Sequence, residues 1–207
     1  MRIVLREYQR QDFKALADIV RKTWRYDEFC TPETADRLAG VFLSSCLTNY
    51  TFSRVAVVEG RPVGVILAKS EKEHRCTFSD RLRQICAVAA LFSSREGRTV
   101  SKIFKSVNGI DRNLLKDCGR EYQGEIALFA IDGNFRGKGI GKTLFRSALD
   151  YMTAQNIQEF YLFTDTSCNY GFYEHQGMTR RCEKKHTFDV YGQTAEMKFF
   201  IYDFKCI

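Results

Sequence analysis

The segment from Glu125 to Thr143 limits the fold of this chain more than any other part of the sequence. It begins with an apolar strand pattern over 125–132 and continues into a glycine-rich turn. Apolar residues then recur at helical spacing over 144–152, which predicts an amphipathic helix. A strand, a glycine-rich turn and a helix start together favour an anion site. Glycines let backbone N–H groups converge there, and the helix dipole attracts negative charge.

Basic side chains reinforce the prediction of an anion site. The stretch from 136 to 146 holds cations and no acidic residue, and these cations are Arg136, Lys138, Lys142 and Arg146. A phosphate or pyrophosphate group is the natural ligand of such a turn.

Two familiar phosphate motifs do not fit this turn. A Walker A loop needs a glycine where Arg136 stands. The dinucleotide fingerprint G-x-G-x-x-G does not match Gly137, Gly139 and Gly141, which run G-x-G-x-G, and no parallel β-α-β repeat precedes the strand.

A third phosphate motif, Arg/Gln-x-x-Gly-x-Gly/Ala, is matched in full by Arg136, Gly139 and Gly141. In this motif and beyond it the chain resembles the GNAT superfamily of acyl-CoA-dependent N-acyltransferases, whose members bind pyrophosphate with this loop. The similarity extends over 1–69 and 124–207. It includes the stretch 169–178 (NYGFYEHQGM), which resembles the late Asn…Phe-Tyr-x-x-x-Gly-Phe segment of the family.

The resemblance implies that acetyl-CoA is the acyl donor, with its pyrophosphate on the N–H groups of 137–142. Main-chain groups near Phe129 and Ile131 would hold the pantetheine arm and the acyl carbonyl, in a cleft where strand 125–132 diverges from strand 160–164. Asn169 matches a family position whose side chain touches the cofactor. The expected cofactor-binding residues are therefore Phe129, Ile131, Arg136, Gly137, Lys138, Gly139, Ile140, Gly141, Lys142 and Asn169.

The same resemblance suggests two catalytic residues, Glu125 and Tyr173. Glu125 opens the central strand, where the family often places a base for the acceptor amine. A solvated strand-end acid in an ion pair is the alternative, and Glu121 is a second candidate. Tyr173 matches the family position whose hydroxyl faces the leaving sulfur. A packing role for Tyr173 is the alternative, and Tyr170 is the second candidate for this hydroxyl.

Other reactive side chains carry less information. Cys168, His175, Cys182 and His186 match no zinc template, so we expect no metal. Cys168 would form an acyl-enzyme only if its thiol were activated, and we expect a small buried thiol instead.

The remaining patterns predict a mixed α/β chain with the element order β-α-α-β-β, helical insert, β-α-β-α-β-β. We expect a single GNAT-like domain over 1–207, with residues 70–123 as a helical insert between the third and fourth strands. A turn is expected at Tyr191-Gly192.

The insert departs from the family, which commonly joins these two strands by a short turn. It holds two apolar helical stripes, which we expect to pack on each other and on the sheet. Because the insert leads directly into the strand that bears Glu125, we hypothesise that it forms one wall of the acceptor pocket. A homodimerisation element or a solvated basic face is the alternative.

Composition sets the wider limits. With 207 residues, 44% hydrophobic and 14% aromatic, the chain is of a folded, globular class. Its longest apolar run, 85–92, falls far short of the roughly 20 residues of a membrane-spanning helix. The eight cysteines form no CxxC pair, and we read them as reduced thiols of a cytoplasmic protein. The net charge of +7 permits an anionic partner without requiring one.

The sequence therefore favours an N-acetyltransferase that moves an acetyl group from acetyl-CoA to a primary amine by direct attack on the thioester. Two alternatives stay open: an acyl-CoA-binding regulatory domain with little turnover, and an acetyltransferase acting on ribosomal or tRNA-linked amines. We expect no membrane partner and do not favour nucleic acid as a partner. The acceptor cannot be identified from the sequence.

Overall fold

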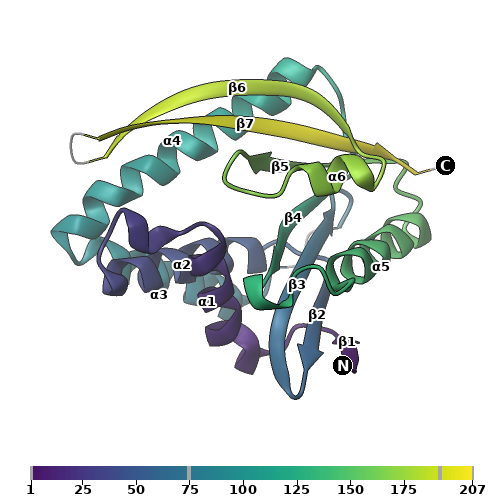
Figure 1. Cartoon of the computed structure of the whole chain (residues 1–207), viewed down its shortest axis with the longest axis horizontal. Helices are drawn as coiled ribbons and strands as arrows, with labels where there is room; N and C mark the ends of the chain where they lie inside the picture. Colours follow the sequence, from purple (N-terminus) through teal and green to yellow (C-terminus); the bar gives the residue numbers. More distant parts are fainter. Residues whose placement is uncertain (1, 74–75, 191–192, 207) are drawn as a thin grey trace.

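The computed structural model describes residues 2–73, 76–190 and 193–206, and these form a seven-stranded mixed sheet with helices around it (Figure 1). The strand order in the sheet is β1-β2-β3-β4-β5-β7-β6. The strands are β1 (Ile3–Arg6), β2 (Phe52–Val58), β3 (Arg61–Ser70), β4 (Gly124–Ile131), β5 (Glu159–Asp165), β6 (Thr179–Val190) and β7 (Gln193–Lys205). The mixed α/β order predicted from the sequence is confirmed, and the turn expected at 191–192 lies outside the described residues.

The helices fall where the apolar periodicity places them. They are α1 (Phe13–Thr23), α2 (Pro32–Leu47), α3 (Phe78–Phe92), α4 (Arg95–Cys118), α5 (Ile140–Ala154) and α6 (Gly171–His175), with short 3-10 turns at Arg10–Asp12, Tyr26–Glu28 and Gly133–Phe135. No helix in the described part of the chain is both long and apolar enough to cross a membrane.

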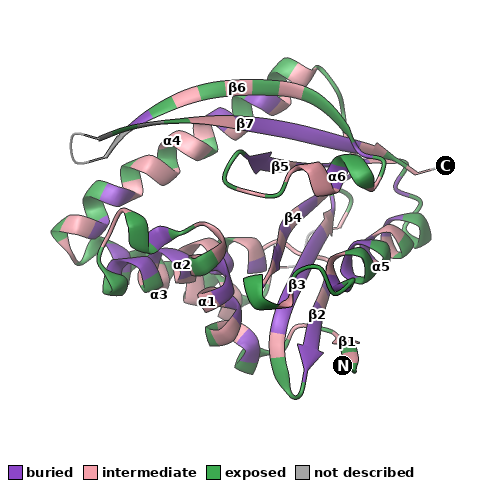
Figure 2. Ribbon diagram, in the orientation of Figure 1, coloured by how far each residue is buried: buried purple, intermediate pink, exposed green. Residues whose placement is uncertain are grey.

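Helices cover both faces of the sheet, and each face has its own core. α1 and α2 pack on one face, and α5 and α6 pack on the other. Neighbouring residues of β3 show the alternation: Val65 belongs to the α1–α2 core and Ile66 to the α5–α6 core, and both are fully buried. Figure 2 shows the resulting buried stretches along β2, β3 and β7.

The insert between β3 and β4 is made of α3 and α4, as expected. α4 carries a third apolar cluster, in which Ile110 and Leu114 pack against β5, β6 and β7. Its first turn is tied to α2, because Glu96 accepts hydrogen bonds from the Thr31 N–H (3.0 Å) and the Thr31 hydroxyl (2.6 Å). The start of α2 is therefore capped by a carboxylate of the insert and not by the hydroxyl of Thr31 itself.

The expectation that both apolar stripes of the insert are covered is wrong for α3. Leu82, Ile85 and Phe92 are 48%, 57% and 47% exposed. α3 turns a largely polar face to its neighbours instead: Gln84 Nε2 donates to Ser45 Oγ of α2 at 3.2 Å, and Arg83 lies over the ring of Phe13. Helical periodicity finds the apolar stripe, but it does not say which face is packed.

Two leucines of the insert provide a stability test. We expect Leu114→Ala on α4 to destabilise the protein by about 2–5 kcal/mol, because it leaves a cavity between α4 and the sheet. Leu82→Ala on α3 should change the free energy of unfolding by less than about 0.5 kcal/mol. Urea denaturation followed by circular dichroism measures both changes, and equal losses would contradict the described packing of the two helices.

Candidate active site

The sheet opens where its two central strands run parallel. β4 and β5, both fully described, pair only at Gly124–Phe160 and Glu125–Tyr161. Beyond these pairs β5 continues along β7, from Glu159–Lys205 to Asp165–Phe199, while β4 continues along β3. The two strands therefore diverge after Glu125, as predicted, and leave a wedge-shaped gap between the halves of the sheet (Figure 1).

Strand β4 presents unpaired backbone to this gap. The N–H of Asp132, just past the strand end, donates to Val63 O on the β3 side at 2.9 Å. Because backbone groups of successive residues in a strand point to opposite edges, those of Ile131 and Phe129 point toward β5. The main-chain groups predicted to hold a ligand are therefore directed into the gap.

The glycine-rich turn lies at the open end of β4. Gly137 and Gly139 have φ angles of +74° and +80°, which side chains other than glycine rarely adopt. Gly139 is the N-cap of α5, whose first backbone bond runs from Thr143 N–H to Gly139 O at 3.1 Å. The N–H groups of 137–142 have no acceptor within the described part of the chain, so the turn offers a set of free donors at the positive end of a helix.

The side chains of the turn play different parts. Arg136 and Lys142 line the cleft. Lys138 folds back on the turn, donating to Asn134 O at 3.0 Å and lying over the ring of Phe135. Ile140 is 1% exposed, so its side chain belongs to the core, and only its main chain is part of the turn.

A single cleft of about 910 Å³ joins these features and continues beyond them. One end is formed by the turn, with Gly137, Gly139 and Gly141 on its wall. The other end is closed by α2 and by the middle of α4. The α4 residues that line it are Phe104, Val107, Asn108, Asp111, Arg112 and Leu115. The insert thus forms one wall of the cleft.

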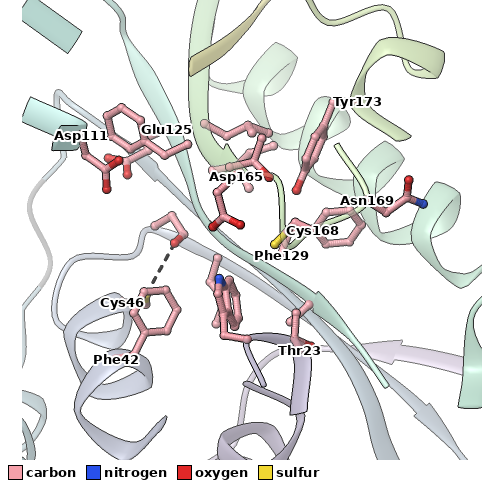
Figure 3. A pocket seen from close by; sticks show the side chains of 18 of the residues that line it. Thr23, Phe42, Cys46, Asp111, Glu125, Phe129, Asp165, Cys168, Asn169 and Tyr173 are labelled. Carbon is pink, nitrogen blue, oxygen red and sulfur yellow. Dashed lines mark hydrogen bonds between the residues drawn. The ribbon is translucent and has the colours of Figure 1, made fainter. Parts of the chain in front are cut away.

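Tyr173 lies on α6, and its ring lies beside Phe129 of β4. Its ring packs among aromatic neighbours, including Phe129 and Phe172, and the residue is only 8% exposed. Its hydroxyl points into the cleft (Figure 3). Burial raises the pKa of this hydroxyl above its ordinary value of 10.0, so at neutral pH it carries its proton and can donate a hydrogen bond. Asn169 lies on the exposed part of the lining.

Glu125 lies at the closed end of the cleft, on the last residue pair that joins β4 to β5. Its Oε2 accepts from Lys69 Nζ at 2.8 Å and from the Tyr161 hydroxyl at 3.0 Å. The sequence left a base and an ion-paired strand-end acid as alternatives. The structure shows the ion pair, with the carboxylate still on the cleft wall.

Comparison with known proteins identifies the family of this chain. A sequence profile of the acetyltransferase (GNAT) family matches residues 13–178. The chain belongs to the GNAT family. No curated protein sequence matches it.

Solved structures share the GNAT fold at low identity. PaiA N-acetyltransferase from Thermoplasma acidophilum, in complex with coenzyme A, is 16% identical with a TM-score of 0.51, and all of both chains is covered. An N-acetyltransferase from Staphylococcus aureus Mu50 is 14% identical with a TM-score of 0.55, over 99% of each chain. The NatC complex bound to Gag peptide and CoA is 16% identical with a TM-score of 0.52, over all of both chains. At these identities the likeness shows the fold alone.

Sequence reasoning missed two carboxylates of this GNAT cleft, Asp111 on α4 and Asp165 at the end of β5 (Figure 3). Burial, with the nearby charges of Glu125 and Asp165, raises the pKa of Asp111 from its ordinary value of 3.8 to about 7. Burial also raises the pKa of Asp165. An acid within the apolar stripe of α4, one position after Ile110, was the available signal for Asp111. For Asp165, its position at the end of a strand gave no comparable signal in the sequence.

Cys168 also lines the cleft. Burial raises the pKa of its thiol to about 11, so it is protonated at neutral pH, as expected for a structural thiol and not for an activated nucleophile. Within the described residues, no three side chains of His, Cys, Asp or Glu are close enough together to bind one metal ion.

The raised pKa of Asp111 makes a prediction about stability. A folded-state pKa near 7, above the ordinary 3.8, means that the folded protein binds this proton more tightly than the unfolded chain. The cost of ionising Asp111 therefore grows as pH rises from about 4 and is complete above about 7. Asp111→Asn removes that cost. Its advantage over the wild type should be larger at pH 8 than at pH 5, by at most about 3 kcal/mol.

Urea unfolding of both proteins at the two pH values measures this difference. A stability gap that stays constant, or that shrinks toward pH 8, would contradict the described environment of Asp111.

Proposed function

We propose that this protein transfers an acetyl group from acetyl-CoA to a primary amine by direct attack of the amine on the thioester. The observation that carries the proposal is the edge of β4 that has no partner strand among the described residues. It leads, within one cleft, to the N–H groups of 137–142, which have no acceptor in the same part of the chain. A ligand that fits must combine an anionic end with an extended arm that accepts and donates main-chain hydrogen bonds. Acetyl-CoA has this shape, and GNAT membership supports it as the donor.

Each part of the donor has a proposed partner. The N–H groups of 137–142 bind the pyrophosphate, with the side chains of Arg136 and Lys142 adding positive charge. The main chain of Phe129 and Ile131 holds the pantetheine arm and the acyl carbonyl. Asn169 contacts the cofactor from the α6 side of the cleft.

The acceptor amine must lose protons for the reaction to balance. An alkylammonium group with a pKa near 10.4 costs roughly 4–5 kcal/mol to deprotonate at neutral pH. After one proton leaves, the nitrogen forms a bond to the acetyl carbon, the carbon–sulfur bond breaks, and the new amide nitrogen loses its second proton. We propose that Glu125 receives a proton through water, since Lys69 and Tyr161 hold its Oε2 and keep the carboxylate oriented.

The departing sulfur takes up a proton or a strong hydrogen bond. Tyr173 supplies it in this proposal, from a hydroxyl directed into the cleft. Because burial raises the pKa of Tyr173, complete proton transfer to a free thiolate is unfavourable, and a hydrogen bond that strengthens as the carbon–sulfur bond breaks is the better description. Water in the cleft can then deliver a proton to the CoA sulfur.

Tyr173→Phe tests this role. The ring keeps its packing and only the donor is lost, so we expect kcat to fall by roughly 10- to 100-fold with little change in the Kd of acetyl-CoA. Release of the CoA thiol gives kcat, and calorimetry gives the Kd. Tyr170→Phe is the matched control, because the Tyr170 ring packs on Phe200 and Arg180 outside the cleft lining. Equal activity of Tyr173→Phe and wild type would remove Tyr173 from the mechanism.

Two cations one helical turn apart test the donor site. Lys142 lines the cleft, whereas Arg146 is exposed and lies outside the lining. We expect Lys142→Gln to weaken acetyl-CoA binding by roughly tenfold or more, because it removes a charge-assisted contact to phosphate. Arg146→Gln should change the Kd by no more than about twofold. Calorimetry at a fixed salt concentration compares the two, and similar losses would place the pyrophosphate elsewhere.

A further inference from the structure

Three carboxylates line the cleft: Asp111 from α4, Glu125 from β4 and Asp165 from β5. Asp111 and Glu125 lie together, and Asp165 lies between them and Tyr173 (Figure 3). Lys69 neutralises Glu125 through their 2.8 Å ion pair. Arg112, which also lines the cleft, is exposed and pairs with no carboxylate among the described residues. Asp111 and Asp165 are therefore left without a cationic partner in the described part of the chain.

Of the three carboxylates, Asp165 is the nearest to Tyr173. Figure 3 shows it between Tyr173 and the pair formed by Asp111 and Glu125. Its charge contributes to the raised pKa of both the Tyr173 hydroxyl and Asp111, which places it within electrostatic reach of each. The residue is only 8% exposed. Its Oδ1 accepts from the N–H (2.7 Å) and the hydroxyl of Ser167, and its Oδ2 has no partner among the described residues.

Asp111 lies farther from Tyr173 than Asp165 does (Figure 3). The nearby charges of Glu125 and Asp165 contribute to the raised pKa of Asp111. Its side chain makes no hydrogen bond or ion pair with the described residues. A half-buried carboxylate with no partner is costly to ionise. A cation that binds beside it removes that cost.

The cleft that holds these carboxylates is also lined by aromatic side chains. Trp24 and Phe42 lie on one side, with ring centroids 5.0 Å apart, and Phe104 and Phe163 add further apolar surface. Aromatic faces suit a methylene chain and also attract cations. This part of the cleft thus combines two carboxylates, Asp111 and Asp165, with apolar aromatic surface.

We propose that the acceptor is an aliphatic amine with a second positive charge, whose reacting ammonium binds Asp165 and whose other cation binds Asp111. This inference rests on the proposed acetyltransferase function and narrows its acceptor to diamines and related polycations. Asp165 positions the reacting nitrogen beside the thioester. A proton of that ammonium group passes through water to Glu125. Asp111 acts on specificity, and it belongs to the insert that departs from the common GNAT pattern.

Matched acceptors provide the test. Acetyl-CoA and α,ω-diaminoalkanes of four to eight carbons are compared with n-alkylamines of the same chain length, by release of the CoA thiol. For at least one length, kcat/KM should be roughly 10- to 100-fold higher for the diamine, the range expected for a hydrogen bond to a charged group. Equal kcat/KM for diamine and monoamine at every length would overturn the proposal.

Two aspartate-to-asparagine variants on α4 test whether Asp111 causes the preference for diamines. Asp111→Asn should bring the diamine-to-monoamine ratio of kcat/KM close to one. Asp117→Asn is the matched control on the same helix, because Asp117 is 61% exposed and lies outside the cleft lining. It should keep the wild-type ratio. An unchanged ratio in Asp111→Asn would overturn the role of Asp111.

Acetyl-CoA binding separates this inference from the proposed function. A protein that binds acetyl-CoA and acetylates monoamines and diamines equally contradicts only the present inference. Binding of acetyl-CoA without acetylation of any of these amines also overturns it, since the diamines are its central case. Failure to bind acetyl-CoA would instead contradict the proposed function.

Discussion

The functional architecture depends on one interruption of backbone pairing. β4 and β5 share two residue pairs and then diverge, because β5 pairs with β7 along its length while β4 stays with β3. Backbone polar groups removed from water must find partners. The β4 edge is open to the cleft, so a ligand can supply those partners. The glycine-rich turn, α6 and the insert are all arranged around this opening.

Charge is distributed along the cleft in a way that the net charge of +7 conceals. Arg136, Lys142 and the N–H groups of 137–142 make one part of the cleft positive, whereas Asp111 and Asp165, farther along it, have no cationic partner among the described residues. Acetyl transfer brings together a polyanionic donor and a cationic amine. In the proposed reaction, these opposite charges would give each substrate its own part of the cleft and oppose binding in the reverse orientation.

The sequence was sufficient for features that depend on local pattern. Strand 125–132, the glycine-rich turn and the helix after it follow from apolar periodicity and from the spacing of the glycines. Features that depend on tertiary contacts could not be predicted from the sequence. The exposed face of α3 depends on its polar contacts with α2, and the partners of Glu125 come from other strands. Asp111 reaches the cleft only because α4 packs across β5 to β7.

A crystal structure of the protein with a non-hydrolysable thioether analogue of acetyl-CoA tests the proposed acetyl transfer most directly. We predict that the pyrophosphate binds the N–H groups of 137–142 and that the pantetheine arm lies along the main chain of Phe129 and Ile131. We also expect the sulfur beside the Tyr173 hydroxyl, with the part of the cleft around Asp111 and Glu125 left open. An analogue bound outside the gap between β4 and β5, or a complex in which Tyr173 faces away from the sulfur, would contradict the proposed function.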